Sequence, residues 1–359
     1  MAGRAARAVS RGLLESAVVG AKASAQSEAV IASVAFRNFK ALRNTELALA
    51  PFNLVIGPNG SGKTSLIQAL LQLRGLAGLP PGEAEPDGAA VEGGAVITWT
   101  LGPPYDGWKV EMSCVHELRC DRLRVLQEGE GTWEEIKARI QTARAYAFEH
   151  RALGESSRDE DGGRLAADGR NLAAVLRRWQ RETPDTFLRL SNEVSRILTE
   201  YDGVDFHEQA AGEWQVGLRL KGEANVIAGP DLSQGTLYVL ALLTLALDPS
   251  SPAIVCIEEI DRGIHPRLLR DVRDALYQLC YPDTGAGSGG TQVIATTHSP
   301  YLLDLFRDHP EEVVIAQKQG AAAHFSRLSE RDDLGELLGE GSLGDIWFSG
   351  VLGGVPEES

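Results

Sequence analysis

The residues from Gly57 to Thr64 form a segment that could bind the phosphates of a nucleotide. They read Gly-Pro-Asn-Gly-Ser-Gly-Lys-Thr and lie between an apolar run, Phe52 to Ile56, and a helical pattern, Ser65 to Leu73. Glycines let consecutive backbone N–H groups face one anion, the lysine reaches the β and γ phosphates, and the threonine hydroxyl binds Mg²⁺. The pattern predicts a phosphate-binding loop between a strand and a helix. The residues expected to bind the nucleotide here are Asn59, Gly60, Ser61, Gly62, Lys63, Thr64 and Ser65.

A second segment with the features of a phosphate site is Leu232 to Thr236, which begins a strongly apolar helix. Ser233 is well placed as the N-cap, and Gly235 allows another backbone to approach closely. The start of a helix carries unpaired N–H groups and a partial positive charge, so it can bind a phosphate. An ordinary capped core helix would have the same sequence, and this segment alone leaves both interpretations open.

Two acids, Glu258 and Glu259, end the apolar strand pattern from Ala253 to Ile257. The first could orient Mg²⁺, and the second could activate a water molecule for in-line attack on a phosphate. Paired carboxylates at the end of a strand cost free energy unless they are solvated or used. A surface turn is the alternative, and the phosphate loop upstream favours the catalytic interpretation.

The next strand pattern ends at Thr296-Thr297-His298-Ser299-Pro300. Ser299 and Pro300 suit the N-cap and first turn of a helix. His298 needs a different explanation, and we expect it to donate a hydrogen bond to a γ-phosphate.

The elements that must position these residues alternate between strand and helix, which indicates an α/β fold of the P-loop type. We expect one domain over residues 29–350. Its core comprises residues 29–80 and 215–350, and the insertion comprises a small β region at 95–126 and amphipathic helices within 130–205. Residues 1–28 and 351–359 are expected to be tails. The expected strands are Val30–Phe36, Phe52–Ile56, Ala95–Leu101, Trp108–Leu126, Trp214–Leu220, Ala253–Ile257 and Gln292–Ala295, and the expected helices run from Trp133 to Arg151 and Asn171 to Tyr201 and start at Gln234, Pro266 and Pro300.

Composition excludes several classes of function. No apolar run reaches the roughly 18 residues of a membrane span, so we expect no membrane partner. The net charge of −15 means that contact with DNA would need a local basic patch or a groove formed by a dimer. The four cysteines have no paired spacing, which suggests a reducing compartment, and Cys114, His116 and Cys120 fit no zinc pattern. The N-terminus lacks the apolar core of a secretory signal, and we expect a cytoplasmic protein.

Together these motifs resemble the ABC-type ATPase heads of the RecF, SMC and OLD-like branch, an AAA-family ATPase without a Toprim domain. The resemblance implies an α/β P-loop head with a β and helical insertion, with ATP and Mg²⁺ as cofactors. It also implies a homodimer in which two heads enclose two ATP molecules, each signature serine completing the partner's site. Arg37, in the opening Phe36 to Lys40, would approach the bound nucleotide. The implied roles are Walker A for Gly57–Thr64, signature for Leu232–Thr236, Walker B for Ile254–Glu259, D-loop for Ile260–His265 and switch histidine for His298.

Three features depart from the family's pattern. Glu258 replaces the usual aspartate, so its contact with Mg²⁺ is expected to pass through water and hydrolysis to be slow. The Q-loop glutamine could be Gln68, Gln72 or Gln127. The insertion is too short for a long coiled coil, and about 60 residues after His298 are too few for a Toprim nuclease domain.

The leading hypothesis is an ATP-dependent dimerising switch or motor in DNA repair or phage defence, acting with a nuclease or another effector protein. An ATPase subunit of a membrane transporter would share the motifs. However, the 170 residues between Lys63 and Ser233 exceed the spacing of transporter heads. A non-hydrolysing regulatory scaffold is the third possibility, against which Glu259 and His298 argue.

Overall fold

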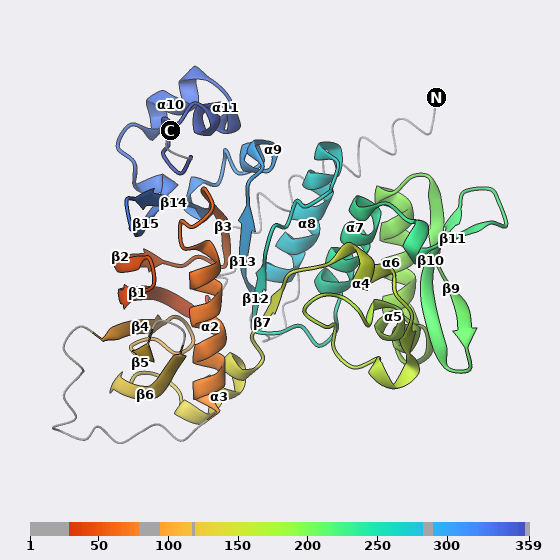
Figure 1. Ribbon diagram of the computed structural model, residues 1–359, viewed down its shortest axis with the longest axis horizontal. Coiled ribbons are helices and arrows are strands. Elements are labelled where there is room, and N and C mark those ends of the chain that lie inside the picture. Colours follow the sequence, from red (N-terminus) through yellow and green to blue (C-terminus); the bar gives the residue numbers. More distant parts are fainter. Residues whose placement is uncertain (1–28, 79–93, 117–118, 283–289, 356–359) are drawn as a thin grey trace.

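The computed structural model describes residues 29–78, 94–116, 119–282 and 290–355 (Figure 1). A six-stranded sheet with the order β15-β14-β3-β13-β12-β7 forms the centre, and all its neighbours pair in parallel except β14 and β15. Its inner strands are buried along their whole length, which explains their continuous apolar sequences. The strands are β3 (Phe52–Ile56), β7 (Arg144–Tyr146), β12 (Ile254–Ile257), β13 (Gln292–Thr297), β14 (Val313–Gln319) and β15 (Ala322–Arg327).

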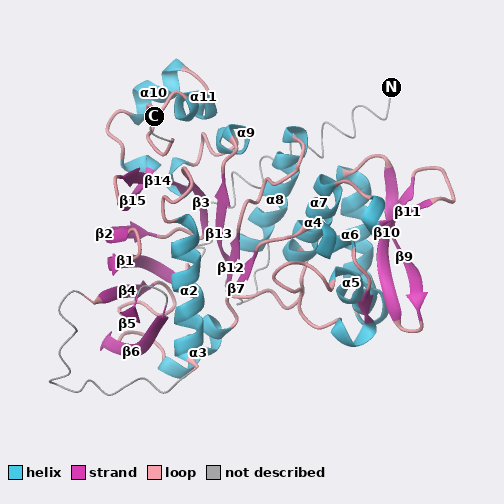
Figure 2. Ribbon diagram, in the orientation of Figure 1, coloured by secondary structure: helices cyan, strands magenta, loops and turns pink. Residues whose placement is uncertain are grey.

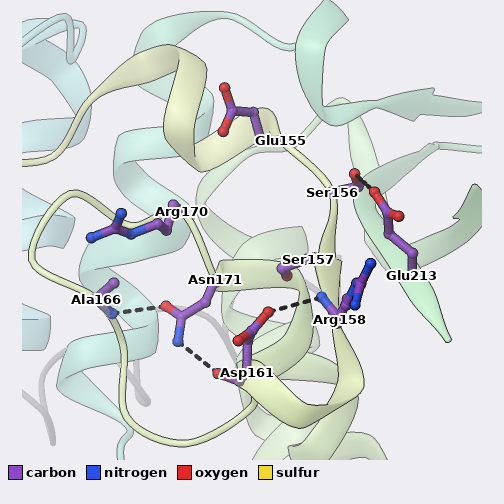
Figure 3. A pocket seen from close by; sticks show the side chains of 9 residues that line it. All are labelled: Glu155, Ser156, Ser157, Arg158, Asp161, Ala166, Arg170, Asn171 and Glu213. Carbon is purple, nitrogen blue, oxygen red and sulfur yellow. Dashed lines mark hydrogen bonds between the residues drawn. The ribbon is translucent and has the colours of Figure 1, made fainter.

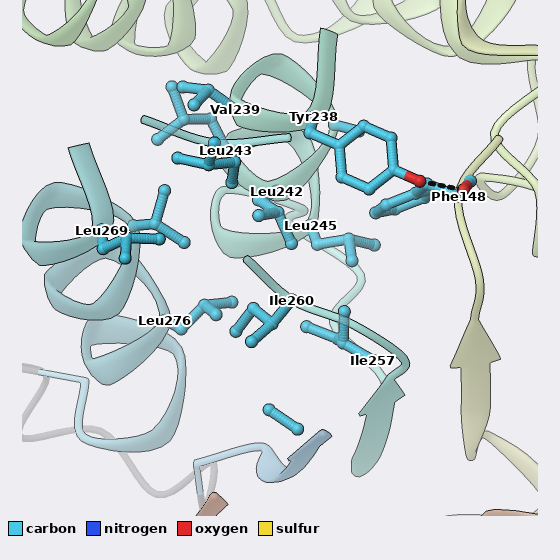
Figure 4. Packing of buried hydrophobic residues seen from close by; sticks show 14 of the residues in the cluster. Phe148, Tyr238, Val239, Leu242, Leu243, Leu245, Ile257, Ile260, Leu269 and Leu276 are labelled. Atoms are coloured by element: carbon cyan, nitrogen blue, oxygen red, sulfur yellow. Dashed lines mark hydrogen bonds between the residues drawn. The ribbon is translucent and has the colours of Figure 1, made fainter. Parts of the chain in front are cut away.

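Helices cover both faces of this sheet (Figures 1 and 2). On one face lies α2 (Lys63–Ala77), which packs with Val55 of β3. On the other lie α7 (Gln234–Ala246) and α8 (Leu269–Cys280). The helix α7 carries apolar side chains on all sides, as expected for a helix that is buried all round. Figure 4 shows these side chains facing α8 and the chain after β12.

A second sheet, antiparallel and five-stranded, packs against α2 with the order β2-β1-β4-β5-β6. The small β region expected at 95–126 therefore continues the sheet that starts near the N-terminus. Its strands are β1 (Ile31–Phe39), β2 (Leu42–Ala48), β4 (Ala95–Leu101), β5 (Lys109–His116) and β6 (Arg119–Gln127).

The hairpin of β5 and β6 carries a disulfide between Cys114 and Cys120. The expectation that the cysteines do not pair was wrong, because the antiparallel register sets these two residues opposite each other. Cys256 and Cys280 are free and buried. Cysteine usage therefore gives no support for a reducing compartment.

The insertion is less helical than expected. The helix predicted from Trp133 to Arg151 ends at Gln141, because the chain then enters the core sheet as β7. The helix predicted from Asn171 to Tyr201 is broken at Thr183, where Pro184 starts a new helix. Its elements are α3 (Trp133–Gln141), α4 (His150–Gly154), β8 (Ser157–Arg158), α5 (Leu172–Glu182), α6 (Pro184–Ile197), β9 (Tyr201–Ala210), β10 (Glu213–Leu220) and β11 (Val226–Ala228).

The C-terminal part comprises α9 (Pro300–Asp304), β14, β15, α10 (Leu334–Glu340) and α11 (Leu343–Phe348). Leu352 is fully buried, so the packed chain extends beyond the expected end at 350. The expected tail at 1–28 and the last four residues of the expected tail at 351–359 lie outside the described residues. Within the described residues, no helix is long and apolar enough to span a membrane. Single 3₁₀ turns lie at Asp159–Asp161, Gly229–Asp231, Pro266–Leu268, Pro310–Glu312 and Leu328–Glu330.

Candidate nucleotide-binding site

The phosphate loop joins β3 to α2 at the carboxyl edge of the central sheet, and its glycines are required by geometry. Gly60 and Gly62 have φ values of 76° and 93°, which favour glycine. A Cβ on Gly57 would lie 2.2 Å from the carbonyl oxygen of Ala316 on the neighbouring strand β14. The loop can therefore form a tight backbone cradle beside the sheet.

The ammonium of Lys63 donates hydrogen bonds to the loop carbonyls of Gly57 (2.7 Å) and Pro58 (2.9 Å). Burial lowers the pKa of Lys63 to about 8, while the carboxylates of Glu259 and Glu258 raise it. The acids lie near the lysine, because Thr64, the residue after it, hydrogen-bonds Glu258 at 3.1 Å. The lysine is thus held within the cradle, at the place where a phosphate would bind.

Ser61 provides a test of whether a nucleotide fits. Its side chain is fully buried, and its Oγ has no hydrogen-bond partner among the described residues. A buried hydroxyl without a partner costs free energy, and a phosphate oxygen in the cradle could accept its hydrogen bond. The loop therefore fits a polyphosphate.

The two expected Mg²⁺ ligands are neighbours. The hydroxyl of Thr64 donates to Oε2 of Glu258 at 3.1 Å. A hydroxyl and a carboxylate suit Mg²⁺, which usually takes one or two protein ligands together with nucleotide phosphates and water. No group of three or more His, Cys, Asp or Glu residues in the described chain could hold a metal without such help. These residues fit a magnesium ion that arrives with a nucleotide, where it would polarise the phosphate oxygens.

Glu259 is held in an uncommon backbone conformation, with φ at 49°. Its N–H donates to the hydroxyl of Thr296 on β13 at 3.0 Å, which fixes the turn after β12. The side chain is 51% exposed and lies 3.6 Å from the guanidinium of Arg262. Strain of this kind is found at functional sites, and here it directs a carboxylate away from the core.

His298 follows the end of β13 and is exposed. Desolvation lowers the pKa of His298 below 6.5 and the ammonium of Lys63 lowers it further, while Glu259 and Asp261 oppose them. The imidazole therefore lies within electrostatic reach of Lys63 and Glu259. The lowered pKa of His298 favours the neutral imidazole, which can donate one N–H to an anion.

Ser233 caps α7 as expected. Its Oγ accepts from the N–H of Thr236 at 3.2 Å and bonds the Thr236 hydroxyl at 2.8 Å. A Cβ on Gly235 would lie 2.3 Å from the carbonyl oxygen of Gly263, so the glycine allows the helix to touch the loop after β12. Within the described residues, no hydrogen bond connects Ser233 to its own chain's phosphate loop.

Several positioning residues were not predicted. The hydroxyl of Thr297 donates to Asp261 at 2.5 Å and accepts from the N–H of Ser299 at 2.9 Å, so it joins the two strand ends. His150 Nε2 is 3.0 Å from the carbonyl oxygen of Leu232, which ties α4 to the start of the signature segment. The pair Thr296-Thr297 before His298 could have been recognised in the sequence as a source of positioning hydroxyls. Nothing in the sequence around His150 indicates that it contacts the signature segment.

For the remaining expected residues, Arg37 and the candidate Q-loop glutamines, the structure shows no hydrogen bond to the phosphate loop among the described residues. Arg37 lies exposed on β1, where its register partners are Asn44 and Val96, and its approach to the nucleotide stays a prediction. Gln68 accepts from the ammonium of Lys40, and Gln72 accepts from the N–H of Cys120 at 2.5 Å. The Q-loop glutamine therefore stays open.

A cavity of about 620 Å³ lies in the insertion, away from these motifs (Figure 3). Asn171 at its wall has all its amide groups paired, with hydrogen bonds to Ala166, Asp161 and Arg164. The cavity contains none of the expected nucleotide-binding residues. Its other lining residues are Glu155, Ser156, Ser157, Arg158, Arg170 and Glu213.

Comparison with known proteins gives family models for two segments. Residues 134–304 match the family described as "AAA domain, putative AbiEii toxin, Type IV TA system", and residues 30–75 match the family "AAA ATPase domain". The DNA replication and repair protein RecF of Erwinia tasmaniensis is 53% identical over 38 residues, which are 10% of this chain and 10% of that protein.

Two solved structures share the fold. An SMC head bound to the C-terminal winged-helix domain of ScpA has a TM-score of 0.54 at 12% identity, covering 82% of this chain and 97% of that chain. An Smc head with an extended coiled coil, bound to the C-terminal domain of ScpA derived from Pyrococcus furiosus, has a TM-score of 0.50 at 13% identity, covering 86% and 99%. At these identities the likeness shows the fold alone. The chain therefore has the α/β P-loop fold of the SMC heads, and two of its segments match AAA-family ATPase domains.

Proposed function

We propose that this chain binds ATP with Mg²⁺, hydrolyses it, and forms a homodimer around two ATP molecules. One observation carries the proposal: the ends of β3, β12 and β13 bring the phosphate loop, Glu258, Glu259 and His298 to one edge of the central sheet. Gathered there are a cationic cradle, a pair of metal ligands and an exposed carboxylate, which are the parts that phosphoryl transfer to water requires.

Each residue has a separate task in this proposal. Lys63 and the loop N–H groups bind the phosphates, and Thr64 and Glu258 hold Mg²⁺. Glu259 accepts the proton of the attacking water, and neutral His298 donates to the terminal phosphate. The turn fixed by Thr296 positions Glu259 before ATP arrives.

The dimer is supported by the position of Ser233. It caps α7 at the end where the helix carries a partial positive charge, and no hydrogen bond of the described chain links it to its own phosphate loop. A phosphate already surrounded by one chain's loop is best reached by the signature helix of a second chain.

We further propose that the protein uses this ATPase site as a switch in DNA repair or in defence against phage. The RecF match supports the first role and the AbiEii description supports the second. The SMC heads were solved with domains of the protein ScpA, which supports a protein partner here, and we propose that this partner is a nuclease or another effector. DNA as a further ligand and a cytoplasmic location are parts of the same proposal.

The experiment that tests hydrolysis is a steady-state ATPase assay with and without Mg²⁺. Lys63→Ala should abolish ATP binding, and Glu259→Gln should keep binding but stop turnover, because an amide cannot accept the water's proton. Glu336→Gln, an exposed acid on α10, is the matched control and should hydrolyse ATP normally. Turnover by Glu259→Gln at the wild-type rate would show that Glu259 is not the base.

A further inference from the structure

Strand β14 runs beside the phosphate loop, although none of the sequence motifs includes it. Its hydrogen bonds to β3 reach the pair of Ile315 and Ile56, and the loop begins at the next residue, Gly57. Beyond that point the carbonyl oxygen of Ala316 lies 2.2 Å from the position of a Cβ on Gly57. The last residues of β14 therefore lie alongside the loop backbone.

Side chains alternate along a strand, so Lys318 lies on the same face of β14 as Ala316. Gln317 points to the other face, where its Nε2 donates to the carbonyl of Leu352 at 3.3 Å. The ammonium of Lys318 lies 4.0 Å from the position that a Cβ on Gly60 would occupy. A second lysine thus brings its charge to the middle of the phosphate loop.

The charges of the site call for such a cation. The side chains of the site carry no excess of positive charge, because Lys63 and Arg262 only balance the two carboxylates of Glu258 and Glu259. A nucleoside triphosphate with Mg²⁺ adds roughly two negative charges. Lys318 is exposed, and no hydrogen bond or ion pair within the described part of the chain involves its ammonium. Its charge is therefore available to an anion in the loop.

We propose that Lys318 is a further nucleotide-binding residue, whose ammonium contacts the phosphate chain of ATP held in the adjacent loop. The inference rests on the proposed function, since it concerns the same site. A lysine suits this task because its flexible stem lets a compact charge follow the phosphates.

The test is calorimetric titration of the full chain with ATP and Mg²⁺. Lys318→Gln keeps most of the stem and removes the charge, and Lys318→Arg restores the charge. Lys221→Gln makes the same change at an exposed lysine after β10 and controls for the loss of net charge. We expect Lys318→Gln to weaken ATP binding about five- to tenfold, Lys318→Arg to recover most of it, and Lys221→Gln to bind like wild type.

The outcomes separate this inference from the proposed function. If wild type binds ATP and Lys318→Gln binds it as tightly as Lys221→Gln does, the inference is overturned and the proposed function stands. If Lys318→Arg binds as weakly as Lys318→Gln, the role assigned to the charge is wrong. If folded wild-type protein binds no ATP, the proposed function fails together with the inference.

Discussion

The phosphate loop depends on glycines for two physical reasons, which act at different residues. Gly60 and Gly62 adopt positive φ angles that a side chain would strain, whereas Gly57 leaves room for the backbone of Ala316. The positive φ angles could be predicted from the motif itself. The close approach of Ala316 to Gly57 could not be predicted, because it depends on which strand lies next to β3.

We predict that Gly57→Ala destabilises the protein by about 1–3 kcal/mol and impairs ATP binding, since its Cβ would collide with a backbone carbonyl that cannot move aside. Gly75→Ala is the control. It lies in α2, where an added Cβ meets nothing within 4 Å, and should stabilise the helix by about 0.5–1 kcal/mol. Denaturant unfolding and ATP titration measure both effects, and a Gly57→Ala protein as stable as wild type would contradict the packing.

The lowered pKa of Lys63 predicts that ATP binding takes up protons. With a pKa of about 8, half of the free chains carry a neutral lysine at pH 8, and phosphates beside the ammonium raise its pKa again. Binding at pH 8 should therefore take up about half a proton per site from this residue.

Calorimetry in buffers of different ionisation enthalpy measures this uptake. It should rise between pH 7 and pH 8, whereas any uptake by His298, whose pKa lies below 6.5, falls over that interval. An uptake that does not rise towards pH 8 would mean that Lys63 keeps its proton in the free protein.

At the scale of elements, the ends of two neighbouring strands hold the acidic residues. Thr296 at the end of β13 accepts the N–H of Glu259 after β12, and Thr297 in turn holds Asp261. The sequence identifies both strands but not these hydrogen bonds, because their formation depends on the parallel register of β12 and β13.

We predict that Thr296→Val keeps ATP binding, lowers turnover about tenfold or more, and destabilises the fold by about 1–3 kcal/mol. The valine has the same shape but leaves the N–H of Glu259 without its partner, so the carboxylate loses its position. Thr98→Val on β4 makes the same change away from the site and should leave turnover intact. Normal turnover by Thr296→Val would show that the hydroxyl does not position Glu259.

Some elements could be predicted from local pattern and others could not. The core strands at Phe52, Ile254 and Gln292 were identified because they are continuous apolar runs beside glycine-rich or acidic segments. By contrast, β7 has three residues and is a strand only because it pairs with β12, and β9 is largely polar because it is a partly exposed strand of a small sheet. Their structure is fixed by tertiary pairing, which periodicity does not report.

For the whole molecule, the central claim is that two chains share each ATP. Each head carries a complete phosphate loop and a signature serine at the start of α7. If the serine serves the partner's ATP, the nucleotide holds the dimer together, and blocking hydrolysis should make the dimer persist.

Sedimentation of Glu259→Gln with and without ATP tests this claim most directly. We expect a monomer without ATP and a dimer with ATP. Adding Ser233→Arg should remove the dimer, because it places a bulky cation at the start of α7, while Ser250→Arg after the other end of α7 should not. A Glu259→Gln protein that binds ATP and stays monomeric, or a Ser233→Arg double variant that still dimerises with ATP, would contradict the shared site.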